Sequence, residues 1–177
     1  QAQPEAMPAG SLPWAALGRV NLAGSGHCSG ALIGPSLVLT AAHCLYNASS
    51  GHWIAAEYLR FVAGYERDTY LAQSRVSGYQ TAESFNPKAR IEVEKLSNDW
   101  ALLTLETPIG QEVGYFGLLN FDRARLARLN TQKTRFARAG YRREFAHVIS
   151  VDTDCPVHGF LRDLALVLHG CPTQPGD

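Results

Sequence analysis

One histidine in this sequence stands where it could act as a general base. Residues 37–40 form a short apolar run, two alanines follow, and His43 comes directly before Cys44. The small side chains at positions 41 and 42 allow close backbone packing, which would fix the position of the imidazole. A general base needs such a position because proton transfer requires hydrogen-bond reach to the group that loses the proton. A histidine after a strand is more often structural, so the surrounding residues must decide between the two interpretations.

The four cysteines form an even set, which predicts disulfides. Cys28 and Cys44 are separated by 15 residues, and so are Cys155 and Cys171. Of the possible pairings, the local ones, Cys28 with Cys44 and Cys155 with Cys171, are the simplest. Free buried thiols are the alternative. A structural zinc site is not expected because the sequence has no C-x-x-C pair. Two disulfides would indicate an oxidising compartment.

The elements that would position these residues are mostly short β-strands. Many short strands separated by turn residues are typical of a barrel or a sandwich. Helical periodicity is weak and falls in residues 121–129. The aromatic residues Trp53, Tyr58 and Trp100 are expected in the core. Apolar or alternating runs predict strands over residues 15–22, 29–34, 37–40, 59–64, 72–79, 100–105, 136–141, 146–151 and 164–169.

Two motifs taken together resemble the chymotrypsin/trypsin-like serine proteases. Residues 28–33 read Cys-Ser-Gly-Ala-Leu-Ile, and residues 39–44 read Leu-Thr-Ala-Ala-His-Cys. The resemblance implies that His43 is the base of a catalytic triad and that Cys28 pairs with Cys44. It also implies an all-β fold of two packed, antiparallel, six-stranded Greek-key barrels.

The same resemblance predicts how the chain divides. Residues 1–120 are expected to form the N-terminal barrel, which carries the base and the carboxylate that orients it. Residues 121–177 would form the first part of the C-terminal barrel, which is incomplete in this sequence. The segment 152–171 resembles bacterial trypsin-like and glutamyl-endopeptidase-like members, in which a disulfide closes a hairpin shortly before the nucleophile.

A second functional position lies at the start of an apolar strand. Residues 97–103, Ser-Asn-Asp-Trp-Ala-Leu-Leu, resemble the segment of the family that carries the triad aspartate. Asp99 would accept a hydrogen bond from His43, hold its tautomer and stabilise the imidazolium. A turn aspartate that caps a strand is the alternative. Three other carboxylates compete, but none leads into a comparable apolar strand: Asp68, Glu92 and Glu94.

The last two residues of the sequence match the start of the family's nucleophile motif, Gly-Asp-Ser-Gly. The match implies that the N–H of Gly176 helps form an oxyanion hole. It also implies that Asp177 directly precedes the nucleophilic serine, which would follow the printed sequence. A noncovalently bound C-terminal fragment is then the expected partner that completes the second barrel. A continuation past a modified serine and a truncated chain are the alternatives.

Composition and charge exclude several functions. The chain has 16 basic and 16 acidic residues, so no global field favours nucleic acid or an anionic membrane. No stretch approaches the ~20 apolar residues of a membrane span. No cofactor or metal site is expected. Eight of the basic residues fall between Arg123 and Arg143, either as a solvated surface or as a patch for an acidic partner or substrate.

These patterns favour a secreted or periplasmic serine endopeptidase that acts on protein or peptide substrates. A noncatalytic protease-like binding or regulatory protein is the alternative from another class, as is an inactive truncated fragment. The residue that follows Asp177 separates these hypotheses, because only a serine there supports the hydrolase. Primary specificity is not encoded in the printed residues, since in the family it depends mostly on residues after the nucleophile.

Overall fold

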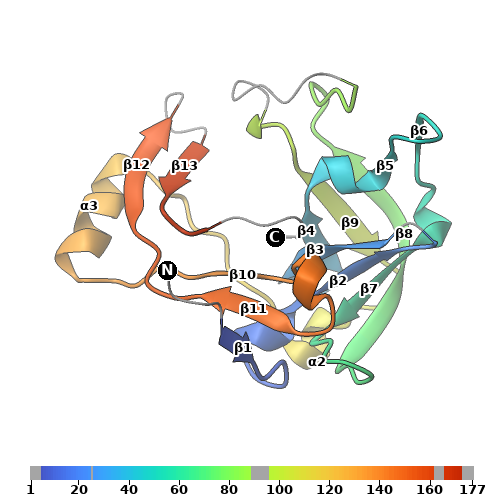
Figure 1. Cartoon of the computed structure of the whole chain (residues 1–177), viewed down its shortest axis with the longest axis horizontal. Helices are drawn as coiled ribbons and strands as arrows, with labels where there is room; N and C mark the ends of the chain where they lie inside the picture. The colour runs from blue at the N-terminus through green and yellow to red at the C-terminus, as the bar shows by residue number, and fades with distance from the viewer. Residues whose placement is uncertain (1–4, 25, 89–95, 162–165, 173–177) are drawn as a thin grey trace.

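The computed structural model of the chain describes residues 5–24, 26–88, 96–161 and 166–172 (Figure 1). Its helices are short: α2 (Gly110–Val113), α3 (Arg123–Thr131) and the 3-10 turns η1 (Trp14–Ala16), η2 (Ala42–Leu45), η3 (Ala56–Tyr58) and η4 (Arg143–Phe145). Its strands are β1 (Glu5–Met7), β2 (Leu17–Leu22), β3 (Gly26–Gly34), β4 (Leu37–Thr40), β5 (Tyr46–Asn47), β6 (His52–Trp53), β7 (Leu59–Ala63), β8 (Ala72–Thr81), β9 (Ala101–Leu105), β10 (Arg138–Gly140), β11 (Ile149–Asp152), β12 (Val157–Leu161) and β13 (Leu166–His169).

Six of these strands close into an antiparallel barrel in the order β2-β3-β4-β9-β8-β7 (Figure 1). Every second residue of β2 is buried, as the two-residue period of a strand requires when one face lines a core. Val20 and Leu22 thereby join a cluster that includes the fully buried side chains of Leu32, Phe61 and Leu103. The predicted all-β fold with a barrel is confirmed.

Gly18 of β2 occupies a position in the barrel wall where no side chain fits. A Cβ at this position would meet the carbonyl oxygen of Val62 and lie 2.5 Å from Cζ of Phe61. We expect Gly18→Ala to lower the free energy of unfolding by about 1–3 kcal/mol, because backbone and ring would have to move. Urea denaturation measures this loss. The matched control is Gly78→Ala on β8, where open space surrounds the Cβ position; an equal loss in both variants would contradict the packing argument.

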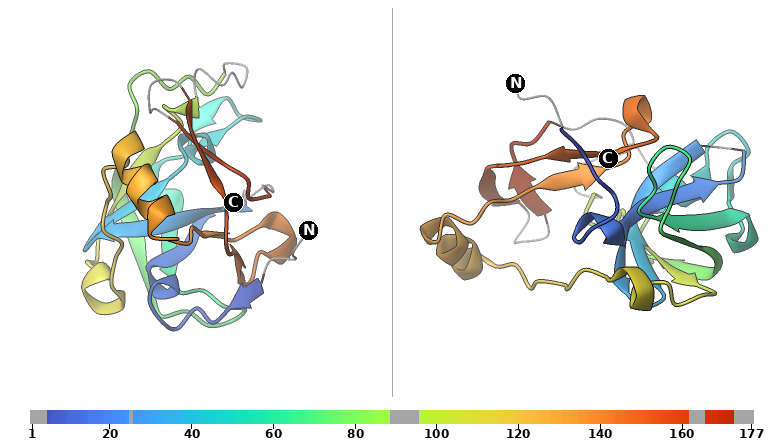
Figure 2. Two further views of the ribbon diagram at one scale, coloured as in Figure 1. Left: turned by 90° about the vertical axis from the view of Figure 1, so that its left-hand side faces the viewer. Right: turned by 90° about the horizontal axis from the view of Figure 1, so that it is seen from below.

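Of the other described strands, β5 and β6 form a short hairpin beside the barrel. The rest form a three-stranded antiparallel sheet, β1-β11-β10, and the hairpin β12–β13 with α3 beside it (Figures 1 and 2). Within the described residues these strands do not close into a second barrel. Pairing of Glu5 with Val151 places the early strand β1 in this sheet rather than in the barrel. The division of the chain at residue 120 stays a prediction.

One buried tyrosine makes several of the hydrogen bonds that attach the sheet to the barrel. The backbone N–H of Tyr141 donates to Oγ of Ser29 at 2.7 Å, and its hydroxyl donates to the carbonyl oxygen of Tyr65 at 2.8 Å. Its carbonyl oxygen accepts a hydrogen bond from Nε2 of His27 at 3.1 Å. Tyr141 has no exposed surface, so three hydrogen bonds from one residue hold the two parts in a fixed relation.

Part of the basic stretch is buried rather than solvated. Arg142 is 4% exposed, and its guanidinium pairs with the carboxylate of Asp152, which is 8% exposed. Nη2 of Arg138 lies 2.7 Å from the same carboxylate oxygen. The interpretation of the whole stretch as a solvated surface is therefore wrong for these two arginines. Arg123 and Arg128 on α3 are exposed, as that interpretation requires.

Some element boundaries differ from the sequence-based predictions. The helix expected over 121–129 is α3, which begins after Asp122 because that carboxylate accepts a hydrogen bond from the backbone N–H of Arg125 at 2.7 Å. Local patterns did not predict strands β1, β5, β6 and β12, although the family resemblance implied a hairpin within 152–171, where β12 lies. All four are short, and tertiary pairing partners, rather than local pattern, decide whether such segments become strands.

Three aromatic residues expected in the core are partly exposed. Trp53, Tyr58 and Trp100 are 39%, 57% and 38% exposed. Trp53 lies on β6, outside the barrel, where its ring packs edge-on against Tyr46 at a centroid distance of 5.5 Å. The prediction that these three side chains are buried is wrong, because Trp53 and Tyr58 lie on elements that flank the barrel and Trp100 precedes the start of β9.

Candidate active site

The pairing of β4 with β9 brings His43 and Asp99 together. These strands are antiparallel neighbours, and their register places Thr40 opposite Ala101. His43 follows the end of β4, and Asp99 precedes the start of β9, so both residues leave the barrel at the same edge. Two residues that are 56 positions apart in sequence therefore make direct contact.

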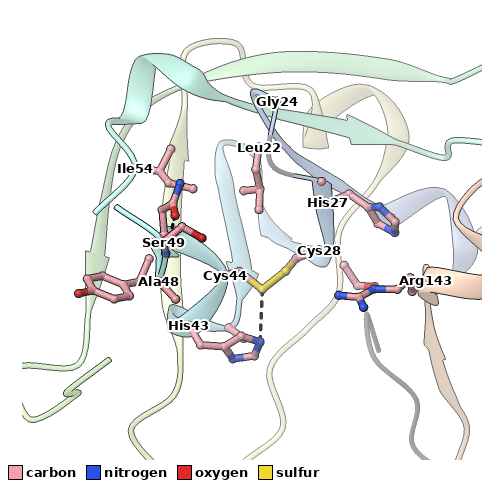
Figure 3. A pocket seen from close by; sticks show the side chains of 15 residues that line it. Leu22, Gly24, His27, Cys28, His43, Cys44, Ala48, Ser49, Ile54 and Arg143 are labelled. Atoms are coloured by element: carbon pink, nitrogen blue, oxygen red, sulfur yellow. Dashed lines mark hydrogen bonds between the residues drawn. A yellow bond between two sulfur atoms is a disulfide. The ribbon is translucent and has the colours of Figure 1, made fainter. Parts of the chain in front are cut away.

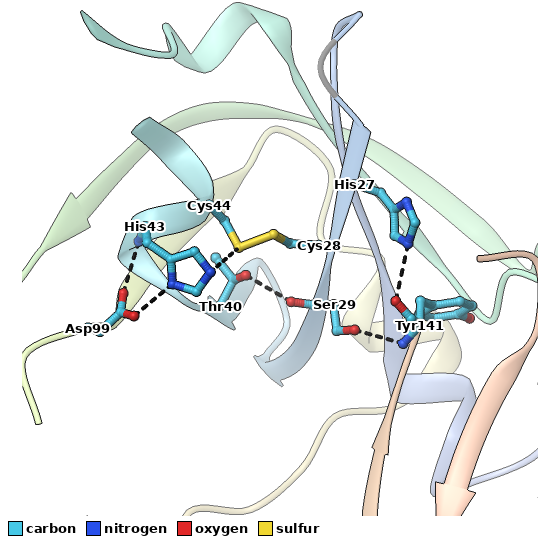
Figure 4. Close-up of a disulfide and its surroundings, with 8 residues drawn as sticks. All are labelled: His27, Cys28, Ser29, Thr40, His43, Cys44, Asp99 and Tyr141. Atoms are coloured by element: carbon cyan, nitrogen blue, oxygen red, sulfur yellow. Dashed lines mark hydrogen bonds and ion pairs between the residues drawn. A yellow bond between two sulfur atoms is a disulfide. The ribbon is translucent and has the colours of Figure 1, made fainter. Parts of the chain in front are cut away.

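One carboxylate holds both the ring and the backbone of His43 (Figure 4). The imidazole Nδ1 of His43 lies 2.7 Å from Oδ2 of Asp99, and the backbone N–H of His43 donates to Oδ1 at 2.9 Å. The His43 side chain is 65% exposed and that of Asp99 is 19% exposed. The imidazole thus faces solvent while the group that orients it is mostly covered.

The competing carboxylates do not share this position. Asp68 is exposed in the turn between β7 and β8 and has no contact with His43 among the described residues. Glu92 and Glu94 lie outside the described residues. Asp99 is therefore the carboxylate that the described part of the chain brings to the histidine.

The two groups shift each other's proton affinity. The hydrogen bond that His43 donates to Asp99 raises the pKa of His43, against an opposing effect of burial, and the negative charge of Asp99 adds to the increase. Burial acts to raise the pKa of Asp99, but the hydrogen bonds and charge of His43 outweigh it and hold that pKa below its ordinary value. Asp99 is consequently ionised at neutral pH.

The ionised carboxylate determines the tautomer of His43. A carboxylate can only accept hydrogen bonds, so Nδ1 must carry the ring proton. The lone pair of the neutral imidazole then lies on Nε2. Within the described residues, the contact of Nε2 is Sγ of Cys44 at 3.8 Å, and no serine hydroxyl hydrogen bonds to the ring. The arrangement can accept a proton at Nε2 and stabilise the resulting imidazolium.

A disulfide between Cys28 and Cys44 joins β3 to η2 directly beside the histidine (Figure 4). Its Cα atoms are 6.3 Å apart. The second disulfide, Cys155–Cys171, closes the ends of the β12–β13 hairpin with Cα atoms 5.1 Å apart. Both predicted pairings are the ones that the structure forms. The Cys28–His43–Cys44 cluster offers no thiolate to a metal, because both sulfurs are bonded to each other.

The two disulfides provide a matched test, because each closes a loop with the same sequence separation of 16. We expect the double variants Cys28→Ala/Cys44→Ala and Cys155→Ala/Cys171→Ala each to lose about 3 kcal/mol of unfolding free energy, since loop length sets the entropic effect. Urea denaturation without reductant measures both. NMR signals of the His43 ring should move only in the first variant; a shift of similar size in the second would contradict a positioning role for Cys28–Cys44.

A cleft of about 950 Å³ opens beside His43 (Figure 3). The disulfide and η2 form one wall, and His27 and Arg143 stand across from His43. The volume lies in the range of ligand sites in proteins. Sequence patterns did not place His27 or Arg143 at this site: His27 belongs to no motif, and Arg143 was noted only as a member of the basic stretch 123–143. Gly176 and Asp177, the predicted oxyanion donor and the residue before the nucleophile, lie outside the described residues.

Comparison of the sequence with models of protein families assigns this chain to a family. The trypsin model matches residues 4–144, well over half of the chain. The chain belongs to the trypsin family of serine proteases. The match includes the elements that carry His43, Asp99 and Cys28–Cys44. It ends before Cys155–Cys171 and the last residues, so the trypsin-family assignment rests on the barrel together with β1, α3 and β10.

Individual relatives agree with the trypsin family. The chain is 39% identical over 87 residues to coagulation factor XII of Cavia porcellus, which covers 47% of this chain and 13% of that protein. It is 33% identical over 92 residues to glutamyl endopeptidase of Bacillus licheniformis, which covers 52% of this chain and 27% of that protein. The chain thus spans less than a third of the length of either relative.

A solved structure confirms the fold beyond the barrel. The chain superimposes on the structure of a Glu endopeptidase in complex with MPD with a TM-score of 0.69, over 96% of this chain and 77% of the other. Sequence identity is 19%, so this likeness establishes the fold alone. No helix in the described residues of this trypsin-family chain is long and apolar enough to cross a membrane.

Proposed function

We propose that this chain carries the base and the orienting carboxylate of a secreted serine endopeptidase. The observation that carries the proposal is the 2.7 Å contact between Nδ1 of His43 and Oδ2 of Asp99, which leaves Nε2 as the acceptor beside an open cleft. The nucleophile is a serine that directly follows Asp177, and the N–H of Gly176 is an oxyanion donor. A C-terminal fragment that completes the second half of the fold is the proposed partner.

The proposed reaction proceeds through an acyl-enzyme. The serine hydroxyl attacks the carbonyl carbon of a peptide bond and transfers its proton to Nε2 of His43. Asp99 stabilises the imidazolium, which then donates that proton to the leaving amine as the C–N bond breaks. Water attacks the ester in the same way: Nε2 takes a proton from the water and returns it to the serine oxygen. The enzyme is regenerated, and the products are a carboxylic acid and an amine.

Two disulfides in a chain of this size support an extracytoplasmic location, because thiols in the cytosol are kept reduced. The noncatalytic alternative, a protease-like binding or regulatory protein, has no chemical need for a histidine whose tautomer is held by a covered carboxylate and whose Nε2 can accept a proton. Retention of the His43–Asp99 contact therefore favours the enzyme.

A fluorophosphonate probe tests the proposal on the complete natural protein. An activated serine displaces fluoride and keeps the phosphonate, which adds a defined mass. We expect intact-mass analysis under denaturing, non-reducing conditions to find one added probe, and fragmentation to place it on a serine that follows Asp177. The same mass spectrum separates a continuous chain from two associated fragments. A residue other than serine after Asp177, or a label elsewhere, would overturn the proposal.

A further inference from the structure

The cleft beside His43 contains a cation that the proposed reaction does not use. Arg143 is the first residue of η4, is exposed, and extends into the cleft from the side opposite His43 (Figure 3). Its guanidinium has no hydrogen-bond or ion-pair partner among the described residues. Its neighbours in the same basic stretch behave differently, since Arg138 and Arg142 are both paired with Asp152. Arg143 is thus available to a ligand.

The wall of the cleft carries positive charge without compensation. Its described lining includes His27, His43 and Arg143 but no aspartate or glutamate. A carboxylate that enters the cleft would meet one permanent cation, Arg143, and no negative charge in the lining. Asp99 lies outside the lining, hydrogen bonded to Nδ1 of His43. Asn47 and Ser49 in the lining add polar groups that can hydrogen bond to a peptide. The lining therefore favours an anionic group over a neutral or cationic one.

His27 is a weaker candidate than Arg143 for the positive charge that would bind an anionic group in the cleft. Burial and the charge of Arg19 lower the pKa of His27, so its ring is neutral at pH 7. Its Nε2 donates to the carbonyl oxygen of Tyr141 at 3.1 Å, which leaves an acceptor nitrogen rather than a second donor. Arg143 is therefore the residue that would recognise a carboxylate in this cleft.

We infer that the cleft is a substrate subsite that selects an acidic side chain, and that Arg143 determines the selection. The inference rests on the proposed function, because it takes the bound chain to be a peptide substrate. The reacting carbonyl must lie near Nε2 of His43, and Arg143 stands across the cleft from it, so the acidic residue is not the one that carries the reacting carbonyl. A volume of about 950 Å³ accommodates more than one residue of a peptide.

Binding tests this subsite without any turnover. The probes are two acetylated, amidated pentapeptides, Ala-Ala-Glu-Ala-Ala and Ala-Ala-Gln-Ala-Ala, in which the glutamate side chain is the one carboxylate. NMR of the isotope-labelled chain follows the side-chain Nε–H of Arg143 and the ring of His27. We expect both signals to move with the glutamate peptide and its Kd to be about three- to tenfold lower than that of the glutamine peptide.

Charge reversal sharpens the test. Arg143→Glu should remove the preference for glutamate and favour a third peptide with lysine at the same position. The matched control is Arg128→Glu on α3, an exposed arginine with the same change in net charge, which should keep the wild-type preference. Equal Kd values for the glutamate and glutamine peptides in wild type would overturn the inference, as would an unchanged preference in Arg143→Glu.

Cleavage of the same peptide pair by the complete natural protein separates this inference from the proposed function. Glutamate-selective binding without cleavage would support the subsite and contradict the endopeptidase. If the complete protein cleaves both peptides, and neither Kd nor kcat/KM favours the glutamate peptide over the glutamine peptide, the endopeptidase would be supported and the subsite contradicted. Selective cleavage that Arg143→Glu reverses supports both.

Discussion

Replacement of His43 by alanine is expected to lower kcat of the complete protease by about 10⁶-fold. Nε2 of His43 is the acceptor that takes the proton of the nucleophile and later returns it to the leaving amine, so its loss affects both halves of the reaction. Single removal of a triad base has an effect of this order in serine proteases. Initial rates with a fluorogenic peptide at saturating substrate measure it.

The control for this variant is another exposed histidine. His52 lies on β6, outside the barrel and outside the lining of the cleft. His52→Ala should keep kcat within about twofold of wild type, as surface changes usually leave the fold intact. Circular dichroism of both variants must match that of the parent. Retention of more than about a tenth of the activity in a folded His43→Ala protein would contradict the assignment of the base.

Asp99→Asn is expected to lower kcat by about 10⁴-fold while the geometry is retained. Asparagine has nearly the same shape, but it can donate a hydrogen bond to Nδ1 and thereby favour the tautomer with the proton on Nε2. That tautomer cannot accept the proton of the nucleophile. The variant also loses the negative charge that stabilises the imidazolium. Single-turnover kinetics with an ester substrate would isolate the acylation step.

The same variant has a predicted effect on the pH profile. Asp99 raises the pKa of His43 above its ordinary value, and burial opposes this shift. The free base is needed for attack, so kcat/KM of the wild type should fall as the pH drops through this raised pKa. In Asp99→Asn the pKa of His43 should decrease, and the remaining activity should persist to lower pH.

An NMR titration of the His43 ring checks that shift independently of turnover. The matched control is Asp68→Asn, which removes an exposed carboxylate in a turn of the same barrel. The control should leave the His43 titration unchanged. A His43 pKa in Asp99→Asn that equals or exceeds the wild-type value would show that another group supplies the charge.

Short stretches of the sequence were enough to predict the strands of the barrel and the histidine proposed as the base. Alternation along residues 17–22 and the apolar runs of β4 and β9 predicted strands because a half-buried strand must alternate and a strand in a barrel wall must cover a core. His43 was recognisable because small residues, a strand and a cysteine surround it. The pattern-based strand predictions left out β1 and β12: β1 becomes a strand through pairing with the distant β11, and β12 through pairing with its hairpin neighbour β13.

The sequence of the basic stretch 123–143 could not predict which of its arginines are buried and which are exposed. Arg142 and Arg143 are adjacent and chemically identical, yet one is buried against Asp152 and the other extends into the cleft. Their environments differ because η4 begins between them and turns the backbone. Trp53 shows the same limit, since its hydrophobicity predicted burial but its hairpin lies outside the barrel.

The sequence by itself determined the family, the strands of the barrel and the identity of the predicted base and its partner, since each of these depends on residue types within a short window. Only the tertiary structure decided which residues from distant parts of the sequence lie next to one another. The antiparallel register of β4 and β9 converts a separation of 56 residues into a hydrogen bond of 2.7 Å between His43 and Asp99. The hydrogen bond from Arg19 of β2 to Ala146, directly after η4, holds η4 beside the barrel, and Arg143 stands across the cleft from that pair. Distances between strands and the burial of charges arise from how the elements pack, and no local pattern encodes them.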